Sequence, residues 1–288
     1  MTTVLAEPRY HSPEVLAEVF TDLEHFGPSG LPFAGGTDVV VGLRKGKLAP
    51  RVMVDLKRVA DLPRGIEVND TWLRVGALTT LSRLVAHPDV RSHFPALVEA
   101  ASTVGSVQIR NRATLAGNIC NASPAADTAP ALIAYHARIS LVSRHGIRRM
   151  SVADFVLGPR RTALRADEVV NGIDLPLDNG VVGSSFTRLT RRRGVDLATV
   201  SVCAVVDRRG THIAYGAVAP RPFVLTDDTG VLADPHADPA TRKALLTGFA
   251  AHASPISDLR ASREYRQAMI IICSERALQT AITRRHRP

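Results

Sequence analysis

The sequence predicts an α+β protein of two domains, residues 1–178 and 179–288. The first domain mixes helical and extended patterns, whereas the second begins with three strand candidates that would run antiparallel, followed by helices. A chain of 288 residues is long enough for two modest cores. The turn-forming cluster Asp178-Asn179-Gly180 separates the two patterns, so we expect the domain boundary there.

The first domain opens with apolar residues at helical spacing, which predict a helix over residues 12–26. Ser12 would cap this helix, and Pro13 would occupy its first position. A segment at 105–124 contains glycines and asparagines and shows no clear period. The remaining patterns predict strands at 31–34, 52–56, 72–75, 137–143 and 169–175, and helices at 37–45, 80–86, 94–103 and 125–136.

The second domain begins with three apolar stretches, 184–190, 199–207 and 211–218, which predict a three-stranded antiparallel sheet. Arg208-Arg209-Gly210 forms a hairpin turn between the last two strands. A polar loop around residues 227–230 follows, and helices at about 239–252 and 263–283 complete the chain.

The composition is that of an ordinary globular protein, with 45% apolar and 22% charged residues. The net charge of +9 is carried almost entirely by arginine. These arginines are scattered and lack interleaved aromatic residues, so we expect no nucleic-acid binding; solvated arginines, some of which face an acidic partner or a phosphate cofactor, explain the charge better. No apolar run approaches the length of a transmembrane segment and the N-terminus lacks a secretory pattern, so a cytoplasmic location is expected.

The cysteine pattern argues against metal sites within this chain. Cys120, Cys203 and Cys273 lie far apart and form no Cys-x-x-Cys motif. Three cysteines alone cannot hold an iron–sulfur cluster, and no histidine pair with a nearby cysteine suggests zinc. Any iron–sulfur cluster would therefore belong to a partner.

The first informative motif is Ala34-Gly35-Gly36-Thr37-Asp38, between a predicted strand and a predicted helix. Glycines allow positive φ and close approach of a ligand, and free amides at a helix start suit a phosphate. The motif is neither a dinucleotide fingerprint nor a P-loop. An ordinary tight turn remains the alternative interpretation.

The second motif is Thr114-Leu115-Ala116-Gly117-Asn118, inside a longer run that begins at Gln108. A threonine hydroxyl, free amides and an asparagine amide provide several neutral donors, which would suit a pyrophosphate. A loop capped by its own polar side chains is the alternative. Asp127 follows in the first turn of an alanine-rich helix, where it would either complement the helix dipole or accept hydrogen bonds from cofactor hydroxyls.

Together these motifs resemble the flavoprotein (medium) subunits of the xanthine dehydrogenase and carbon monoxide dehydrogenase family of molybdenum hydroxylases. The resemblance runs the whole length in order. It is carried by the segments 34–38, 54–56, 108–118, 124–127, 192–198, 216–220 and 255–266. It implies a PCMH-type FAD-binding domain of two α/β subdomains over residues 1–178, and over residues 179–288 the C-terminal domain of such subunits.

The resemblance also implies which residues hold FAD. The two turns would bind its pyrophosphate from opposite sides, with Thr114 and Asn118 as side-chain donors. Asp127 would lie beside the flavin nucleotide, Val170 would contact the cofactor, and Leu197 would lie near the isoalloxazine ring. Arg188 stands where relatives often have a lysine. The full expected set is Leu31, Pro32, Phe33, Ala34, Gly35, Gly36, Thr37, Asp38, Ala113, Thr114, Leu115, Ala116, Gly117, Asn118, Asp127, Val170, Arg188 and Leu197.

One position departs from the family pattern, because Ala116 replaces the first of two adjacent glycines. If positive φ were needed there, alanine would be strained by roughly 1 kcal/mol or more. If only space were needed, a methyl group could be accommodated. Two other functions therefore stay open: an FAD-free docking subunit, and a self-contained FAD oxidoreductase. We identify no acid–base pair and no catalytic residue.

The resemblance finally implies the partners of this chain. A large subunit would hold the molybdenum cofactor and oxidise the substrate, and a small subunit with two [2Fe-2S] clusters would relay electrons to FAD. FAD would pass them to an external acceptor. A dimer of heterotrimers is typical of relatives. The C-terminal domain would help to dock the partners or serve as scaffold.

Overall fold

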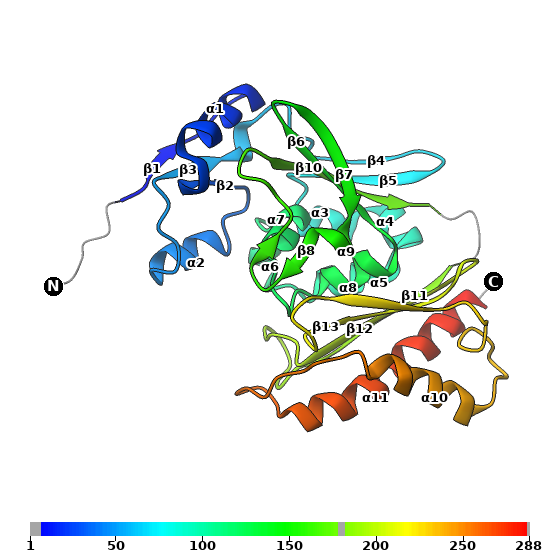
Figure 1. Ribbon diagram of the computed structural model, residues 1–288. Coiled ribbons are helices and arrows are strands. Elements are labelled where there is room, and N and C mark those ends of the chain that lie inside the picture. Colours follow the sequence, from blue (N-terminus) through cyan, green and yellow to red (C-terminus); the bar gives the residue numbers. More distant parts are fainter. Residues whose placement is uncertain (1–6, 178–181, 287–288) are drawn as a thin grey trace.

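The computed structural model describes residues 7–177 and 182–286. Figure 1 shows two bodies in contact, the first built from residues up to 177 and the second from residues 182 onward. The turn cluster 178–180, where we expected the domain boundary, lies outside the described residues. No described helix has the length and apolar character needed to cross a membrane.

A parallel three-stranded sheet begins the chain within residues 7–177. Its strands lie in the order β1 (Arg9–His11), β3 (Val52–Asp55) and β2 (Gly30–Phe33). The helix α1 (Leu16–Phe26) buries Val19 and Leu23 in the same small core as Val54. The short elements of this subdomain are η1 (Gly27–Ser29), α2 (Val39–Arg44) and η2 (Leu56–Arg58).

The start of α1 differs from the prediction. Val15, rather than Ser12, is the N-cap residue, and no side chain caps the helix from that position. The amide of Leu16 instead donates to Asp61 Oδ2 at 2.8 Å. A carboxylate 45 residues away therefore satisfies a free helix amide, which a local capping rule could not foresee.

The second subdomain contains a five-stranded antiparallel sheet, again within residues 7–177. The strand order is β4 (Ile66–Val68), β5 (Trp72–Gly76), β10 (Val169–Pro176), β6 (Arg138–Ser143) and β7 (Gly146–Ser151). The prediction missed both edge strands. None of their residues is buried, so they lack the apolar pattern of the central strands.

Short helices cover this sheet and surround the largest core. Val107–Arg110 and Leu115–Cys120 are both helical, so the segment without clear period folds as two brief helices. The alanine-rich helix is shorter than predicted but almost entirely buried. The elements are α3 (Leu81–Ala86), α4 (Pro88–His93), α5 (Pro95–Ser102), α6 (Val107–Arg110), α7 (Leu115–Cys120), α8 (Thr128–Ala134), α9 (Val152–Phe155), β8 (Val156–Gly158) and β9 (Arg161–Thr162).

Within residues 182–286, the sheet of the second domain has four strands rather than the three predicted. They are β11 (Gly183–Leu189), β12 (Val200–Asp207), β13 (Gly210–Gly216) and β14 (Phe223–Asp227), in that order and antiparallel. The prediction left residues 223–226 of β14 unassigned, although three of them, Phe223, Val224 and Leu225, are apolar. The helices α10 (Pro239–Ala250) and α11 (Arg263–Arg285) agree closely with the predicted ranges.

This second sheet lies between helices of both domains (Figure 1). On one face, Val202 and Ile213 share a core with α10 and α11. On the other face, Cys203 and Ala214 belong to the large core of the first domain. Every residue of β12 is buried, which explains its continuous apolar sequence.

Polar contacts also join the two domains. Glu99 of α5 accepts hydrogen bonds from the amide of Phe186 at 2.8 Å and from Arg284 at 2.5 Å. The hydroxyls of Tyr135 and Ser184 lie 2.5 Å apart. These contacts fix the second sheet against α5 and α8.

Candidate functional site

The two glycine-bearing turns meet in the folded chain. A Cβ atom built on Gly35 would lie only 2.1 Å from the carbonyl oxygen of Arg112 and 3.0 Å from the Cα of Ala113. Such a separation is possible only because position 35 has no side chain. The backbones of residues 35 and 112, which are 77 positions apart in the sequence, therefore touch.

The first turn connects β2 to α2. Leu31, Pro32 and Phe33 lie in the strand, and Ala34 to Asp38 form the turn. Gly36 has a φ of +72°, a left-handed conformation that favours glycine. The turn directs its backbone toward the second motif, and its residues up to Thr37 are half-buried.

A pocket of about 170 Å³ lies where the two turns meet. It is smaller than the several hundred Å³ typical of sites that enclose a drug-sized ligand, so it can hold the phosphates of a dinucleotide but not the whole molecule. Its lining combines both turns with three cationic side chains. The lining residues are Ala34, Gly35, Lys57, Arg64, Leu78, Thr80, Asn111, Arg112 and Thr114.

Lys57 is held in place at this pocket by an ion pair and an aromatic ring. Its Nζ donates to Asp55 Oδ2 at 2.6 Å and lies 4.6 Å from the centre of the Phe33 ring. Asp55 is buried and also accepts from the hydroxyl of Tyr10 at 2.6 Å. Burial raises the pKa of Asp55, but the hydrogen bonds from Lys57 and Tyr10 outweigh it and lower the pKa overall.

The sequence prediction missed Lys57, Arg64 and Arg112 as pocket residues. Neither arginine has a carboxylate partner within residues 7–177 and 182–286, so both remain able to attract an anion. The signal for Lys57 was present, because it follows the segment 54–56 that carried the resemblance. Lys57 lies far along the chain from both glycine turns, so the sequence alone did not place it at the same pocket.

The second turn leads into α7. Thr114 is the N-cap residue, and its hydroxyl oxygen accepts from the amide of Gly117 at 3.0 Å. Ala113, Leu115 and Ala116 are buried in the large core. Only Thr114, Gly117 and Asn118 therefore present polar groups near the turn, so part of the alternative interpretation holds: this loop is capped by its own threonine.

Ala116 occupies an ordinary helical conformation. It lies in α7 and is absent from the residues with positive φ. Its methyl group packs within the large core. The substitution of glycine by alanine therefore introduces no backbone strain, and alanine is the better helix former.

Asp127 is buried beside the second domain. Its Oδ2 accepts from Arg188 at 2.6 Å and from the Thr103 hydroxyl at 3.0 Å. Its Oδ1 is buried and has no hydrogen-bond partner among the described residues. Burial raises the pKa of this carboxyl, although Arg188 and Thr103 act in the opposite direction. An unpaired buried oxygen of this kind fits a donor supplied by a ligand.

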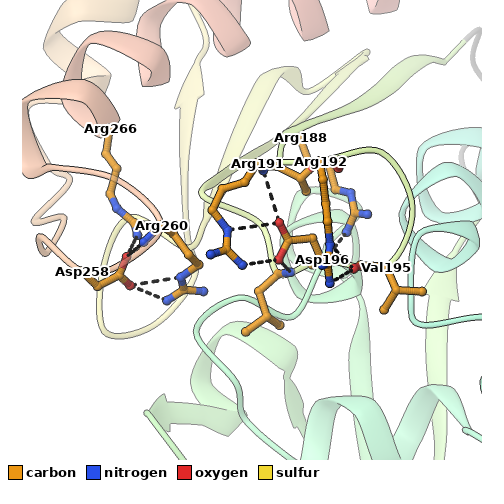
Figure 2. A network of polar contacts seen from close by, with 10 residues as sticks. Arg188, Arg191, Arg192, Val195, Asp196, Asp258, Arg260 and Arg266 are labelled. Atoms are coloured by element: carbon orange, nitrogen blue, oxygen red, sulfur yellow. Dashed lines mark hydrogen bonds and ion pairs between the residues drawn. The ribbon is translucent and has the colours of Figure 1, made fainter.

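Arg188 pairs with Asp127, and Leu197 lies in the loop that Arg188 also contacts. Arg188 lies on β11 and also approaches the carbonyl of Asp196 at 3.4 Å. Figure 2 shows Arg188 next to the loop that carries Val195 and Asp196. Leu197 follows Asp196 and is 55% exposed. Val170, by contrast, is buried in β10 as part of the large core.

The turn pocket and the Asp127 group are connected through α7. Asn118, near the end of that helix, accepts from the Thr128 hydroxyl at 2.6 Å, and Thr128 directly follows Asp127. The donors around the pocket suit phosphates, and the orphaned carboxylate oxygen suits a hydroxyl or ring N–H. The arrangement fits an elongated ligand with a charged middle, such as FAD. The described residues contain no group of three or more potential metal ligands.

Two protein-family descriptions match this chain. The FAD binding domain in molybdopterin dehydrogenase matches residues 6–178, and the CO dehydrogenase flavoprotein C-terminal domain matches residues 185–281. Together these matches span nearly the whole length.

Full-length relatives give the same picture. A xanthine dehydrogenase FAD-binding subunit from Escherichia coli O157:H7 is 31% identical over 281 residues, which cover 95% of each chain. The carbon monoxide dehydrogenase medium chain of Hydrogenophaga pseudoflava is 30% identical over 282 residues, covering 96% of this chain and 97% of the relative.

Solved structures share the fold. A carbon monoxide dehydrogenase from Hydrogenophaga pseudoflava, which lacks the Mo-pyranopterin moiety of its molybdenum cofactor, matches with a TM-score of 0.88 and 28% identity over 98% of this chain and 99% of that chain. Quinoline 2-oxidoreductase from Pseudomonas putida 86 matches with a TM-score of 0.85 and 26% identity over 97% and 98%.

Proposed function

Because the chain belongs to the family of FAD-binding medium subunits of molybdenum hydroxylases, of the xanthine and carbon monoxide dehydrogenase type, we propose that it carries electrons between subunits and an external acceptor. It is thus one part of an oxidoreductase. FAD, when bound, supplies the chemistry, because it can take up and release electrons. The protein contributes binding, orientation and electrostatics.

The contact between the two glycine turns carries this proposal. It places residues of two distant motifs around one small pocket, which Lys57, Arg64 and Arg112 also line. Converging amides and cations bind phosphate groups, which stay charged at neutral pH. We therefore propose that residues 31–38 and 113–118 hold the pyrophosphate of FAD, with Lys57 as a positioned counter-charge.

The second end of the site lies at the domain interface. We propose that Asp127 accepts a hydrogen bond from FAD through its unpaired Oδ1 while Arg188 holds its other oxygen. Leu197 then provides an apolar surface for the flavin ring. For Val170, the support is the family resemblance and its position on β10. The next residue on this strand, Asn171, accepts a hydrogen bond from the amide of Ala77 through its carbonyl.

The partners are proposed from the relatives. The matching relatives are named as medium chains or FAD-binding subunits of dehydrogenases, and one solved relative is named a Cu,Mo-CO dehydrogenase. We propose a large molybdenum-cofactor subunit and a small [2Fe-2S] subunit as partners here, in a dimer of heterotrimers located in the cytoplasm. This chain has three separated free cysteines, so the clusters belong to a partner.

The decisive experiment is a flavin assay on the purified chain. We expect flavin absorption near one FAD per chain, with FAD released into the supernatant after heat denaturation. Lys57→Met should lower the affinity for FAD by about tenfold, because one charge-assisted contact is removed. Lys243→Met, on the exposed surface of α10, is the matched control and should leave affinity unchanged. A chain without flavin, even in its assembled complex, would refute the proposal.

A further inference from the structure

The turn between α10 and α11 presents an unusually exposed apolar side chain. Leu259 is 98% exposed, the highest value among the large apolar side chains of the described residues, and Ile256 three positions earlier is 64% exposed. A single exposed leucine needs no explanation by itself. The rigidity of this turn and its position beside the flavin site distinguish Leu259 from an ordinary surface leucine.

Asp258 holds the turn in one shape. Its carboxylate accepts three hydrogen bonds from Arg260, two from the guanidinium at 2.6 and 3.0 Å and one from the amide at 2.8 Å. The amide of Asp258 donates to the carbonyl of Ala261 at 3.1 Å. The backbone on both sides of Leu259 is therefore fixed, so burying this side chain in a partner would cost little ordering entropy.

Arg266 anchors the turn to the sheet. This guanidinium is 1% exposed and donates to Asp258 at 2.7 Å, to the carbonyl of Thr199 at 2.7 Å and to the carbonyl of Ala217 at 3.2 Å. Thr199 lies two residues after Leu197. A single buried arginine thus ties the Leu259 turn to the loop that reaches the flavin site.

The neighbouring loop, residues 191–197, is braced in the same way (Figure 2). Arg191 pairs with Asp196 at 3.0 Å, and Arg192 donates to the carbonyl of Val195 at 2.9 Å. Asp196 and, to a smaller extent, Asp258 raise the pKa of the Arg191 guanidinium. Figure 2 shows Asp258 and Arg260 beside this loop. Val195 is 54% exposed.

The charge of this face is positive. The segments 191–197 and 257–266 contain six arginines, of which Arg266 is buried, and three carboxylates. The face therefore combines a fixed apolar knob with surplus positive charge. Such a surface suits a partner with an apolar pocket rimmed by carboxylates.

We propose that Leu259 and Ile256, together with Val195, form the docking face for the subunit that delivers electrons to FAD, the [2Fe-2S] subunit, and that Leu259 enters an apolar pocket with an acidic rim on that subunit. This inference rests on the proposed function. Two observations favour this occupant. The face adjoins the loop of Leu197, where an electron donor must approach the flavin. A rigid, fully exposed leucine also suits a permanent subunit interface better than a brief encounter with an acceptor.

The test uses the assembled complex, isolated through a tag on this chain from the native host. Leu259→Glu should lower the retention of the iron–sulfur subunit by at least about tenfold, measured as iron and acid-labile sulfide per chain, because a charge would enter an apolar pocket rimmed by carboxylates. Leu259→Met should retain that subunit. Ile147→Glu, at a 54% exposed position of the edge strand β7, is the matched control and should behave as wild type.

The flavin content of the same preparations distinguishes a failure of the docking assignment from a failure of the proposed function. We expect Leu259→Glu to keep its full FAD, since Leu259 touches neither glycine turn nor Asp127. Wild-type iron retention in Leu259→Glu, or loss of molybdenum with iron retained, would overturn the docking assignment alone. So would a change limited to self-association of this chain. A wild-type chain without FAD would instead overturn the proposed function, and the docking assignment with it.

Discussion

Replacement of Gly35 by alanine should separate the two turns that form the phosphate pocket. The added Cβ would lie 2.1 Å from the carbonyl oxygen of Arg112 and 2.7 Å from its carbonyl carbon. Carbon and oxygen atoms in contact normally stay at least about 3.3 Å apart, so one backbone must move by about 1 Å. Both obstacles are backbone atoms, which cannot rotate away as a side chain would.

The expected result is a loss of FAD affinity rather than of folding. A displacement of about 1 Å at a preorganised site costs on the order of 100-fold, which corresponds to about 2.7 kcal/mol of binding free energy. Overpacking should also reduce the free energy of unfolding by roughly 1–3 kcal/mol. The affinity is measured by titrating FAD into the flavin-depleted chain, and the unfolding free energy by urea denaturation.

Gly65→Ala provides the matched control for this experiment. Gly65 lies next to the pocket residue Arg64, but a Cβ there would meet nothing within 4 Å. We expect this variant to bind FAD as the wild type does. If Gly35→Ala also bound FAD with unchanged affinity, the contact between the turns would not define the phosphate site.

Three further predictions concern other parts of the chain. Arg188→Met should reduce the free energy of unfolding by about 3 kcal/mol in urea, because it leaves the buried Asp127 carboxylate without its cation, whereas Arg188→Lys should retain most of it. Ala116→Gly should lower the unfolding free energy by about 1 kcal/mol without improving FAD affinity, since Ala116 is helical; tighter FAD binding would restore the case for a glycine requirement. Burial raises the pKa of Asp207, but hydrogen bonds from His212 and Arg209 lower it by a larger amount. The pKa of Asp207 therefore lies below the usual value of about 3.9. The stability that this group adds is present above about pH 4 and is lost as the pH falls further; Asp207→Asn should flatten that part of a plot of Tm against pH, and an unchanged slope would contradict the assignment.

Several elements could be predicted from the sequence because local pattern and burial agree. The central strand β12 is apolar along its whole length because both of its faces are covered. The helix α11 follows its predicted range closely, starting at Arg263 behind the cap of Ser262. The two glycine motifs were predicted to bind a ligand, and the structure brings their backbones into contact at Gly35, where a side chain would not fit.

Other features depend on partners distant in the sequence. The strands β7 and β14 lie at the edges of their sheets, where each is held by pairing with one neighbouring strand, and the sequence prediction included neither. The role of Lys57 depends on Asp55 and Phe33 converging at a pocket formed by the second turn. The pairing of Asp127 with Arg188 spans 61 residues, so no local rule identifies it. The family resemblance pointed to each residue separately, whereas the contact between them is seen only in the fold.

The ion pair between Asp127 and Arg188 also restricts how this chain can be rearranged by gene fusion or splitting. The carboxylate lies in the first domain, whereas its arginine lies on β11 in the second. A polypeptide that ended at residue 177 would retain both glycine turns but would lose Arg188, the cation that pairs with Asp127, and the sheet face that completes the large core. The FAD-binding domain is therefore not expected to keep this buried group intact when it is transferred to another protein on its own. A fusion that transfers it must transfer β11 as well or replace the aspartate.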